Sequence, residues 1–342
     1  MFFRLPHANA VVAKILLWHL SFALGLCLVA GSAGAADPIP LRVKVFSGAQ
    51  NLPIYAGLAQ GIFARHGLKV ELQFTRTSTE MRNGLAAGEF EIAHSGVDNA
   101  VAMVEVAGKD TVIVMGGDSS MNEFIVQPDI KSIPDLRGRI VVVDAPNTGY
   151  AQLAKKILLN HGLKDGQDYT VKPVGGSALR LKAVLDSKEH AAVVLNVPWS
   201  ILAVRNGMKS MGRTIDLLGP YQATGAYVMR AWAGENGPAL ERYIAAYVES
   251  LRWALQPSSR GESVALLAKW LKLAPDVAEQ TYDLLREPKF GLSPDARFDR
   301  DGFKNLLALR AEIEGQWGGT PPSPELYFDL GYYERAMKQV GR

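Results

Sequence analysis

The sequence predicts an α/β protein in which one structural unit is used twice, once in each of two lobes. Three observations support this fold class. Strand-like and helix-like segments alternate from residue 41 to about residue 215, one helix–turn–strand unit occurs twice, and the chain beyond residue 237 has a helical pattern. Alternating strands and helices favour parallel sheets covered by helices.

The first run of elements extends from residue 41 to residue 127. Residues 41–46 alternate apolar and basic, which is typical of a half-exposed strand. Gly67 marks a helix end, and Thr77 with Glu80 fits the capping box that opens a helix. The predicted elements are strands at 41–46, 68–74, 92–94, 111–115 and 124–127, and helices at 51–65, 77–88 and 97–107.

A second, similar run follows the turn at residues 133–138, and a helical region follows the second run. The predicted elements of the second run are strands at 139–143, 170–174 and 191–195, and helices at 149–161, 177–186 and 198–205. The helices predicted beyond it lie at 238–255, 259–273, 275–285, 301–313 and 330–340. Residues 315–324 contain too many glycines and prolines for regular structure.

The repeated unit joins residues 85–93 to residues 185–193. Each segment reads as a helix end, a short turn and a strand, and each strand then stops at a polar residue that begins a new helix. That residue is Ser95 in the first copy and Asn196 in the second. We therefore expect Ser95 and Asn196 to occupy equivalent positions in the two lobes.

The N-terminus predicts export. Arg4 and Lys14 precede a short apolar run at residues 15–30, and Ala33-Gly34-Ala35 follows, which together describe a secretory signal peptide at residues 1–35. The alternative is a transmembrane anchor, but about 20 apolar residues are needed to span a bilayer and this run is shorter. We expect a periplasmic protein.

Composition excludes several functional classes. The formal charge of +3 is largely due to the leader, and no basic cluster stands out elsewhere, so we expect no nucleic-acid partner. The single cysteine, Cys27, also lies in the leader, which excludes disulfides and cysteine metal sites from the mature chain. No Walker-type loop, H-E-x-x-H, G-x-G-x-x-G or G-x-S-x-G motif is present. We expect no enzyme activity, metal or cofactor.

Four motifs stand in order along the chain, at residues 53–71 (with AGLAQGIF), 85–93 (LAAGEFEIA), 133–139 (IPDLRGR) and 185–198. They resemble those of periplasmic solute-binding proteins of the nitrate, sulfonate and taurine type, a group that includes binders of thiamine-precursor pyrimidines. The resemblance covers most of residues 41–227.

The resemblance implies a type II periplasmic binding protein-like fold. Two lobes would be joined by crossover segments near residues 127–134 and 215–221. The first lobe would begin with residues 39–128, residues 129–217 would form the second lobe, and residues 218–342 would supply a return strand to the first lobe and the C-terminal helices. The protein would be a monomer that delivers its solute to the permease and ATPase of an ABC importer.

The candidate ligand site lies where strands end and helices begin, because ligands of open α/β sheets bind there and free backbone N–H groups favour anions. The junctions lie at 48–51, 76–79, 95–99, 145–150 and 196–199. The candidate ligand-binding residues are Asn51, Thr77, Ser78, Ser95, Asn147, Thr148, Tyr150, Asn196 and Trp199. Thr77 and Thr148 fit equally well as helix caps, and Tyr150 and Trp199 as core aromatics.

The ligand itself stays open between several classes. Arg76, Arg82 and Arg180 could each pair a sulfonate or carboxylate, or lie solvated at the surface. Asp98 in the cleft would argue against a fully anionic ligand. A sulfonate, a taurine-like compound or nitrate is one prediction, and a pyrimidine stacked on Trp199 is the alternative. A pyrimidine synthase of the same fold would need a cysteine-rich motif, and a transcription regulator would need a DNA-binding helix at its N-terminus.

Overall fold

The computed structural model describes residues 1–3 and 37–340, of which residues 38–340 belong to one compact unit. The leader predicted at residues 1–35 lies, beyond residue 3, outside the described residues. Within the described part of the chain, no helix combines the length and the apolarity needed to cross a bilayer.

The first lobe is built on a five-stranded sheet with the order β2-β1-β3-β10-β4. β1 runs parallel to β2 and β3, and β10 runs antiparallel to β3 and β4. The strands are β1 (Ile39–Phe46), β2 (Leu68–Thr75), β3 (Ile92–Gly96), β4 (Thr111–Asp118) and β10 (Thr224–Met229).

The second lobe repeats this plan with the order β7-β6-β8-β5-β9. β6 runs parallel to β7 and β8, and β5 runs antiparallel to β8 and β9. The strands are β5 (Asn122–Val126), β6 (Ile140–Val143), β7 (Thr170–Pro173), β8 (His190–Asn196) and β9 (Lys209–Arg213). β3 and β8 therefore hold the same third place in their sheets, which is the relationship expected from the repeated unit.

The chain passes between the lobes twice. The first passage, at residues 119–121, joins β4 of the first sheet to β5 of the second, and the second lies between α9 (Thr214–Leu218) and β10. The predicted crossover at residues 127–134 was therefore wrong, because the strand predicted at 124–127 pairs with β8 and β9 of the second sheet. The apolar pattern of this strand would suit a central position in either sheet, so the pattern did not show to which sheet the strand belongs.

Helices cover both sheets. In the first lobe these are α2 (Leu52–Ala59), α3 (Ile62–Arg65), α4 (Ser78–Ala86) and α5 (Asp98–Glu105). The second lobe contributes α6 (Gly149–Asn160), α7 (Ser177–Asp186), α8 (Trp199–Arg205) and α9. The single helix predicted at 51–65 is divided because Gly61 adopts a left-handed φ of 64° between α2 and α3.

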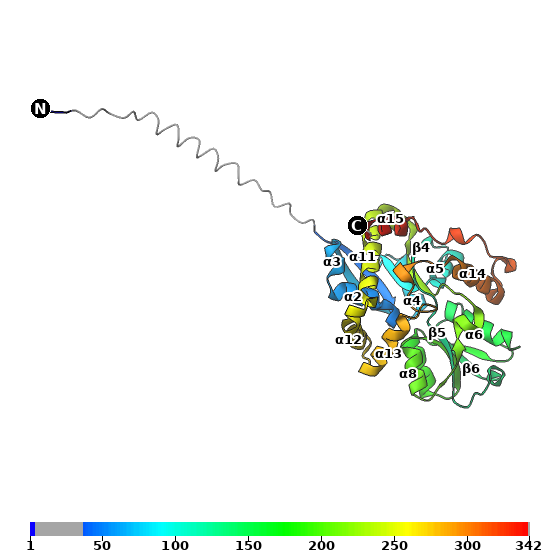
Figure 1. The fold of residues 1–342 in the computed structure, drawn as a ribbon. Coiled ribbons are helices and arrows are strands. Elements are labelled where there is room, and N and C mark those ends of the chain that lie inside the picture. Colours follow the sequence, from blue (N-terminus) through cyan, green and yellow to red (C-terminus); the bar gives the residue numbers. More distant parts are fainter. Residues whose placement is uncertain (4–36, 341–342) are drawn as a thin grey trace. The chain divides into compact units, whose positions relative to one another are not determined.

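The C-terminal region is helical, as predicted. Its helices are α10 (Arg230–Glu235), α11 (Gly237–Leu255), α12 (Arg260–Leu271), α13 (Pro275–Leu285), α14 (Arg300–Glu314) and α15 (Gly331–Val340). α11 packs on α2 and α15 of the first lobe, and α14 packs on α6 of the second lobe (Figure 1). The C-terminal helices therefore complete the first core and also contact the second lobe.

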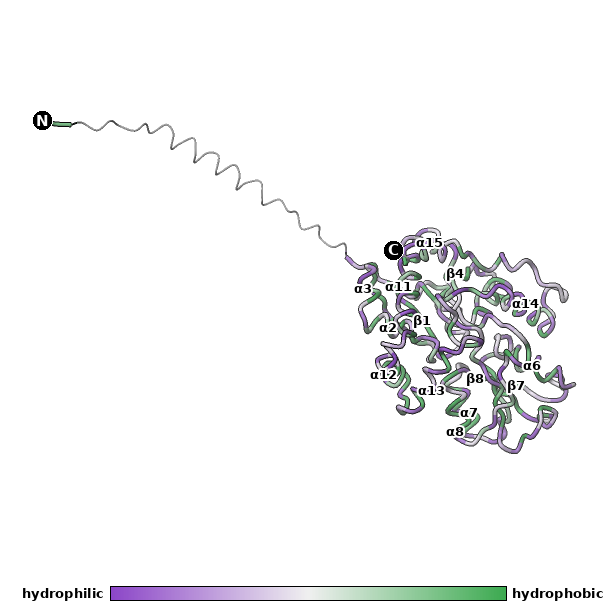
Figure 2. Tube along the Cα trace, in the orientation of Figure 1, coloured by the Kyte–Doolittle hydropathy of each residue, from purple (hydrophilic) through white to green (hydrophobic). Residues whose placement is uncertain are grey.

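The buried faces follow the apolar pattern of the sequence. α11 buries Tyr243, Ile244, Tyr247 and Leu251 in the core of the first lobe, while β8 is buried along its whole length. The colouring of Figure 2 shows polar and apolar residues mixed along the outer helices. Two separately packed sheets leave their strand ends facing each other, and that arrangement creates the site described next.

Candidate functional site

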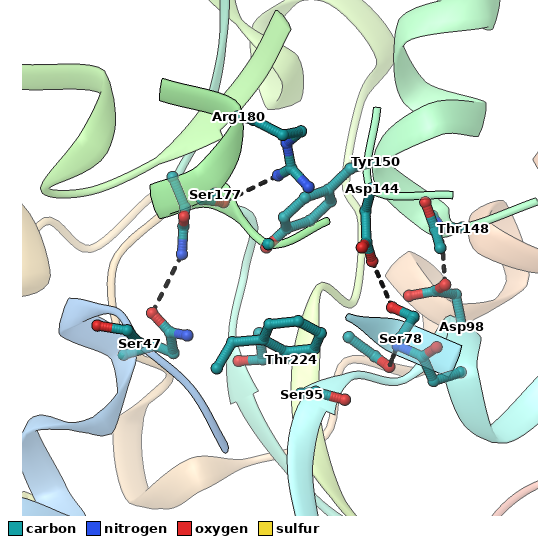
Figure 3. Close-up of a pocket in the computed structure, with 17 residues that line it drawn as sticks. Ser47, Ser78, Ser95, Asp98, Asp144, Thr148, Tyr150, Ser177, Arg180 and Thr224 are labelled. Carbon is teal, nitrogen blue, oxygen red and sulfur yellow. Dashed lines mark hydrogen bonds between the residues drawn. The ribbon is translucent and has the colours of Figure 1, made fainter. Parts of the chain in front are cut away.

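A small cavity of about 40 Å³ lies between the lobes, where strand ends and helix starts converge (Figure 3). By the same measure one water occupies about 10–15 Å³, so the space suits a group of about three or four atoms. The first lobe contributes Phe46, Ser47, Gln50, Ser78, Ser95, Gly96, Asp98, Asn99 and Thr224. The second lobe contributes Asp144, Thr148, Gly149, Tyr150, Gly176, Ser177, Arg180 and Asn196.

Helix starts place most of the polar side chains. Ser78, Asp98 and Ser177 are the first residues of α4, α5 and α7, and Thr148 precedes the first residue of α6. Their backbone N–H groups have no partner within the first helical turn, so these positions favour negative charge. The cavity is therefore surrounded by helix N-termini from both lobes.

Arg180 supplies the buried positive charge of the cavity. Its guanidinium donates to the carbonyl of Gly175 (2.9 Å), the hydroxyl of Ser177 (2.8 Å) and the carbonyl of Val194 (3.2 Å). It also lies 5.2 Å from the ring centroid of Tyr150. Burial lowers the pKa of Arg180, opposed by the charge of Asp144. These contacts hold the guanidinium rigidly and leave Nε without a partner among the described residues.

Two carboxylates join the lobes at the cavity. Asp98 accepts a hydrogen bond from the backbone N–H of Gly149 at 2.7 Å, and Asp144 accepts one from the hydroxyl of Ser78. Burial raises the pKa of Asp98, and the hydrogen bond from Gly149 and the charges of Arg310 and Arg82 oppose that rise. The cavity thus contains one buried cation and two carboxyl groups.

Amide and indole groups add further contacts between the lobes. The amide nitrogen of Asn196 donates to Oε1 of Gln50 at 3.1 Å, and the indole N–H of Trp199 donates to the carbonyl of Ser47 at 3.2 Å. The backbone N–H of Gly176 donates to the carbonyl of Arg76 at 2.9 Å. The two lobes therefore touch on several sides of the cavity.

Three buried acceptor atoms in the lining have no donor among the described residues. They are Oδ1 of Asp144, Oδ1 of Asn99 and Oδ1 of Asn196. Nε of Arg180 is the unpartnered donor of the lining. Buried polar atoms without partners are costly, so a bound group would need to supply hydrogen-bond donors as well as an acceptor.

The cavity includes some of the predicted residues and not others. Those that line it are Ser78, Ser95, Thr148, Tyr150 and Asn196, and Asp98 and Arg180 join them. Thr148 uses its hydroxyl on the carbonyl of Ala145 at 2.9 Å, without capping α6. Ser95 lies within 2.7 Å of the hydroxyl of Tyr227, a buried hydrogen bond inside the first lobe.

The remaining candidates lie outside the lining for identifiable reasons. Asn51 is buried and donates to the carbonyl of Phe46 at 2.6 Å, and Thr77 caps α4 by accepting from the N–H of Glu80 at 3.1 Å. Asn147 accepts at its carbonyl from Arg310 at 3.4 Å. Trp199 donates its indole N–H to the carbonyl of Ser47. Arg76 is exposed, and Arg82 is half-buried and does not line the cavity.

Asp144 and Ser177 line the cavity but were not among the predicted residues. Asp144 directly follows the strand predicted at 139–143, and Ser177 begins the helix predicted at 177–186. Both positions satisfy the same rule that selected the other junctions, namely that ligands bind beyond the carboxyl ends of strands. Applying that rule to every strand of both lobes would have included them.

The chain matches a known protein family. A family model described as ABC transporter, phosphonate, periplasmic substrate-binding protein matches residues 45–229, which is more than half of the chain. The chain belongs to this family of periplasmic substrate-binding proteins. The matched span includes β5 to β9 of the second lobe and most of the strands of the first lobe.

Solved structures share the fold at low sequence identity. A protein of Bordetella bronchiseptica RB50 aligns with a TM-score of 0.75 at 20% identity, covering 90% of this chain and 99% of its own. The periplasmic nitrate-binding protein NrtA from Synechocystis PCC 6803 gives 0.73 at 14%, covering 89% of each chain. The alkanesulfonate-binding protein SsuA from Xanthomonas axonopodis pv. citri gives 0.66 at 18%, covering 84% and 96%. No curated protein sequence shows a significant match.

Proposed function

We propose that this chain is the solute-binding component of an ABC importer and captures a small organic acid of the sulfonate or taurine class between its lobes. The observation that carries the proposal is the buried guanidinium of Arg180, which lines a cavity formed by both lobes. A rigid, desolvated guanidinium whose Nε–H has no partner among the described residues is suited to an acidic oxygen. The protein does no chemistry on its solute.

The unpartnered acceptors favour one part of the predicted ligand range. Asp144, Asn99 and Asn196 each present an oxygen that lacks a donor, whereas nitrate has no hydrogen to donate. An acid that also carries an amine would satisfy both the guanidinium and these oxygens. Among nitrate, a simple sulfonate and a taurine-like aminosulfonate, the aminosulfonate therefore matches the hydrogen-bonding groups of the lining best, and the lobes must part to admit it because the cavity as it stands has room for only about three or four atoms.

The alternative ligand, a thiamine-precursor pyrimidine, loses its main support. That prediction depended on stacking against Trp199, and Trp199 donates its indole N–H to Ser47 and does not line the cavity. The other aromatic candidate, Tyr150, has Arg180 over its ring. A pyrimidine is therefore the second candidate ligand, after the aminosulfonate.

The proposed mechanism is hinge closure about the two chain passages. A solute that contacts Arg180 in one lobe and Ser95 or Asn99 in the other binds the closed form better than the open form, so binding shifts the population towards closure. The closed lobes would then present a single surface to the permease. Export through the predicted leader, action as a monomer and the absence of enzyme activity belong to the same proposal.

A thermal-shift panel tests the function directly. Taurine, ethanesulfonate, nitrate, methylphosphonate and a hydroxymethylpyrimidine would be compared at equal concentrations, and we expect the largest rise in Tm with taurine. Arg180→Gln should abolish the ligand-induced rise, and Arg180→Lys should leave a small part of it. Lys182→Gln is the matched control, because Lys182 lies on the same helix but is exposed. A rise that persists in Arg180→Gln would contradict the proposed role of this residue.

A further inference from the structure

The first passage between the lobes contains a residue with an unusual backbone conformation. Ser120 has a φ of 82° and is buried. Residues other than glycine rarely adopt a positive φ, because the Cβ atom crowds the backbone. Such a conformation persists only where the surrounding contacts hold it, and it is concentrated at functional sites and switch regions. Ser120 is held in this way from both lobes.

The first lobe holds the backbone of Ser120. Oδ1 of Asp118, at the end of β4, accepts a hydrogen bond from the N–H of Ser120 at 2.9 Å and another from the N–H of Met121 at 3.3 Å. Oδ2 of Asp118 accepts one from the hydroxyl of Thr224, which begins β10. Asp118 therefore fixes the start of the first passage to β10, inside the sheet of the first lobe.

The second lobe holds the side chain of Ser120. The hydroxyl lies 2.8 Å from that of Thr214, the first residue of α9, and accepts a hydrogen bond from the amide of Asn122, the first residue of β5, at 3.2 Å. A rotation about φ moves the side chain of Ser120 relative to its own N–H. The contacts with Asp118 and those with the second lobe are therefore satisfied together at the observed φ, and a large change in φ would break one set.

The second passage carries no comparable strain. It turns at Gly219, whose φ of 86° is accessible to glycine without steric cost. Beyond this turn, the side chain of Gln222 donates to the carbonyl of Thr224 at 2.6 Å and accepts from the N–H of Asp299 at 2.7 Å. The first passage, residues 119–121, contains no glycine. Backbone strain in the pair of passages is therefore concentrated at Ser120.

We propose that Ser120 is the hinge residue of the first passage and that its positive φ is confined to the closed form. The inference rests on the proposed function, in which the solute binds the closed form better than the open form. Hinge residues absorb the backbone change of domain closure, so φ of Ser120 relaxes and its hydroxyl leaves Thr214 when the lobes part. Ser120 does not line the cavity. It is a positioning residue that lowers the affinity, because part of the free energy of solute binding is used to strain its backbone.

The test compares Ser120→Gly with Ser120→Ala, which both lack the hydroxyl and differ in their tolerance of a positive φ. By isothermal titration calorimetry with taurine, Ser120→Ala should bind about two- to tenfold more weakly than wild type, because hydrogen bonds of the closed form are lost. Ser120→Gly should bind about five- to thirtyfold more tightly than Ser120→Ala, which is the factor that corresponds to the cost of a left-handed residue other than glycine. Small-angle scattering without solute should give a smaller radius of gyration for Ser120→Gly than for Ser120→Ala.

Lys272 provides the matched control pair. It is exposed at the end of α12, with a φ of 54°, and it lies in neither passage, so its strain is the same in the open and closed forms. Lys272→Gly should therefore have a higher Tm than Lys272→Ala, while the affinities of these two variants for taurine agree within about twofold.

The same behaviour at Ser120, a difference in Tm without a difference in affinity, would overturn the hinge inference and leave the proposed function standing. Absence of taurine binding to the wild-type protein would instead contradict the proposed function. The scattering comparison without solute then decides the hinge inference, because equal radii of gyration for Ser120→Gly and Ser120→Ala would overturn it.

Discussion

Asp98 of the first lobe accepts a hydrogen bond from the backbone N–H of Gly149 of the second lobe at 2.7 Å. Gly149 is the first residue of α6, so the carboxylate sits at the positive end of that helix. The contact closes one side of the cavity, and Gly149 contributes only its backbone to it. Asp98 is therefore part of the contact between the lobes as well as of the cavity lining.

Gly149→Ala should hold the lobes apart. A Cβ at this position would lie 2.5 Å from the hydroxyl of Tyr221 and 2.9 Å from Cγ of Asp98. Overpacking of this kind costs about 1–3 kcal/mol, so we expect solute affinity to fall by about fivefold to a hundredfold. Calorimetry gives the affinity, and small-angle scattering gives the expected increase in radius of gyration.

Gly261→Ala provides the control for that substitution. Gly261 lies within α12, and a Cβ there meets no atom within 4 Å. We expect unchanged affinity and a slight rise in Tm, because alanine favours the helix. Equal loss of affinity in both variants would contradict the steric explanation.

Asp144→Asn should discriminate between amine-bearing and amine-free solutes. Asp144 accepts from Ser78 with one oxygen, and its other oxygen has no donor among the described residues. A hydrogen bond to a charged group contributes about 1.5–3 kcal/mol, so the affinity for taurine should fall by about tenfold or more. The affinity for ethanesulfonate should stay constant or rise. A parallel loss for both ligands, measured by calorimetry, would argue against an ammonium contact at Asp144.

Trp199→Phe should weaken closure modestly. The indole N–H donates to the carbonyl of Ser47 across the lobe interface at 3.2 Å, and such a hydrogen bond contributes about 0.5–1.5 kcal/mol. We expect affinity to fall by about two- to tenfold for every solute. Trp317→Phe is the control, because its indole donates to Glu105 at 2.7 Å, away from the cavity. Retained affinity for a flat pyrimidine alone would instead indicate stacking on residue 199.

His94 should make the folded protein sensitive to acid. Its buried ring stacks on Tyr247 at 4.8 Å, and burial lowers the pKa of His94 to about 3. The unfolded chain takes up a proton at about pH 6.5 and the folded chain does not, so stability is full above pH 6.5 and falls as the pH drops towards 3.

The expected slope is up to about 1.4 kcal/mol per pH unit, or about 2 kcal/mol between pH 7 and pH 5. His94→Phe should lose this contribution while keeping an aromatic ring against Tyr247. Urea unfolding at pH 7, 6 and 5 gives the free energies of unfolding. An identical slope in both proteins would show that His94 titrates in the folded state.

Local patterns were enough to predict much of the fold. The capping residue Thr77 was recognisable because its side chain acts on an N–H three residues away. Ser95 and Asn196 were selected because the two copies share a helix–turn–strand pattern, and both residues line the cavity; in register, Asn196 pairs with the first residue of β5 as Gly96, the neighbour of Ser95, pairs with the first residue of β10. A strand was predicted at 124–127 and is observed at 122–126, but its sheet was not predicted correctly, since an apolar strand can pair equally well with the strands of either sheet.

The predicted site differs from the observed lining because some of the predicted side chains point away from the cavity. Asn51 and Trp199 have the right chemistry at the right junctions, yet each donates to a nearby carbonyl and does not line the cavity. Asp144 stands one residue beyond a predicted strand and reaches Ser78, which lies 66 positions earlier in the chain. No spacing in the sequence specifies such a long-range contact.

The sequence by itself determined the α/β class, the use of one unit in two lobes and the edge of each sheet where polar residues collect, because these depend on local periodicity and on helix starts. Only the tertiary structure decided where the chain passes between the lobes and which polar groups meet. It also placed a second hollow, lined by Phe74, Arg76, Leu179 and Trp270 among others, beside the polar cavity. The physical reason is that hydrogen bonds and apolar contacts between distant segments depend on how two packed lobes face each other.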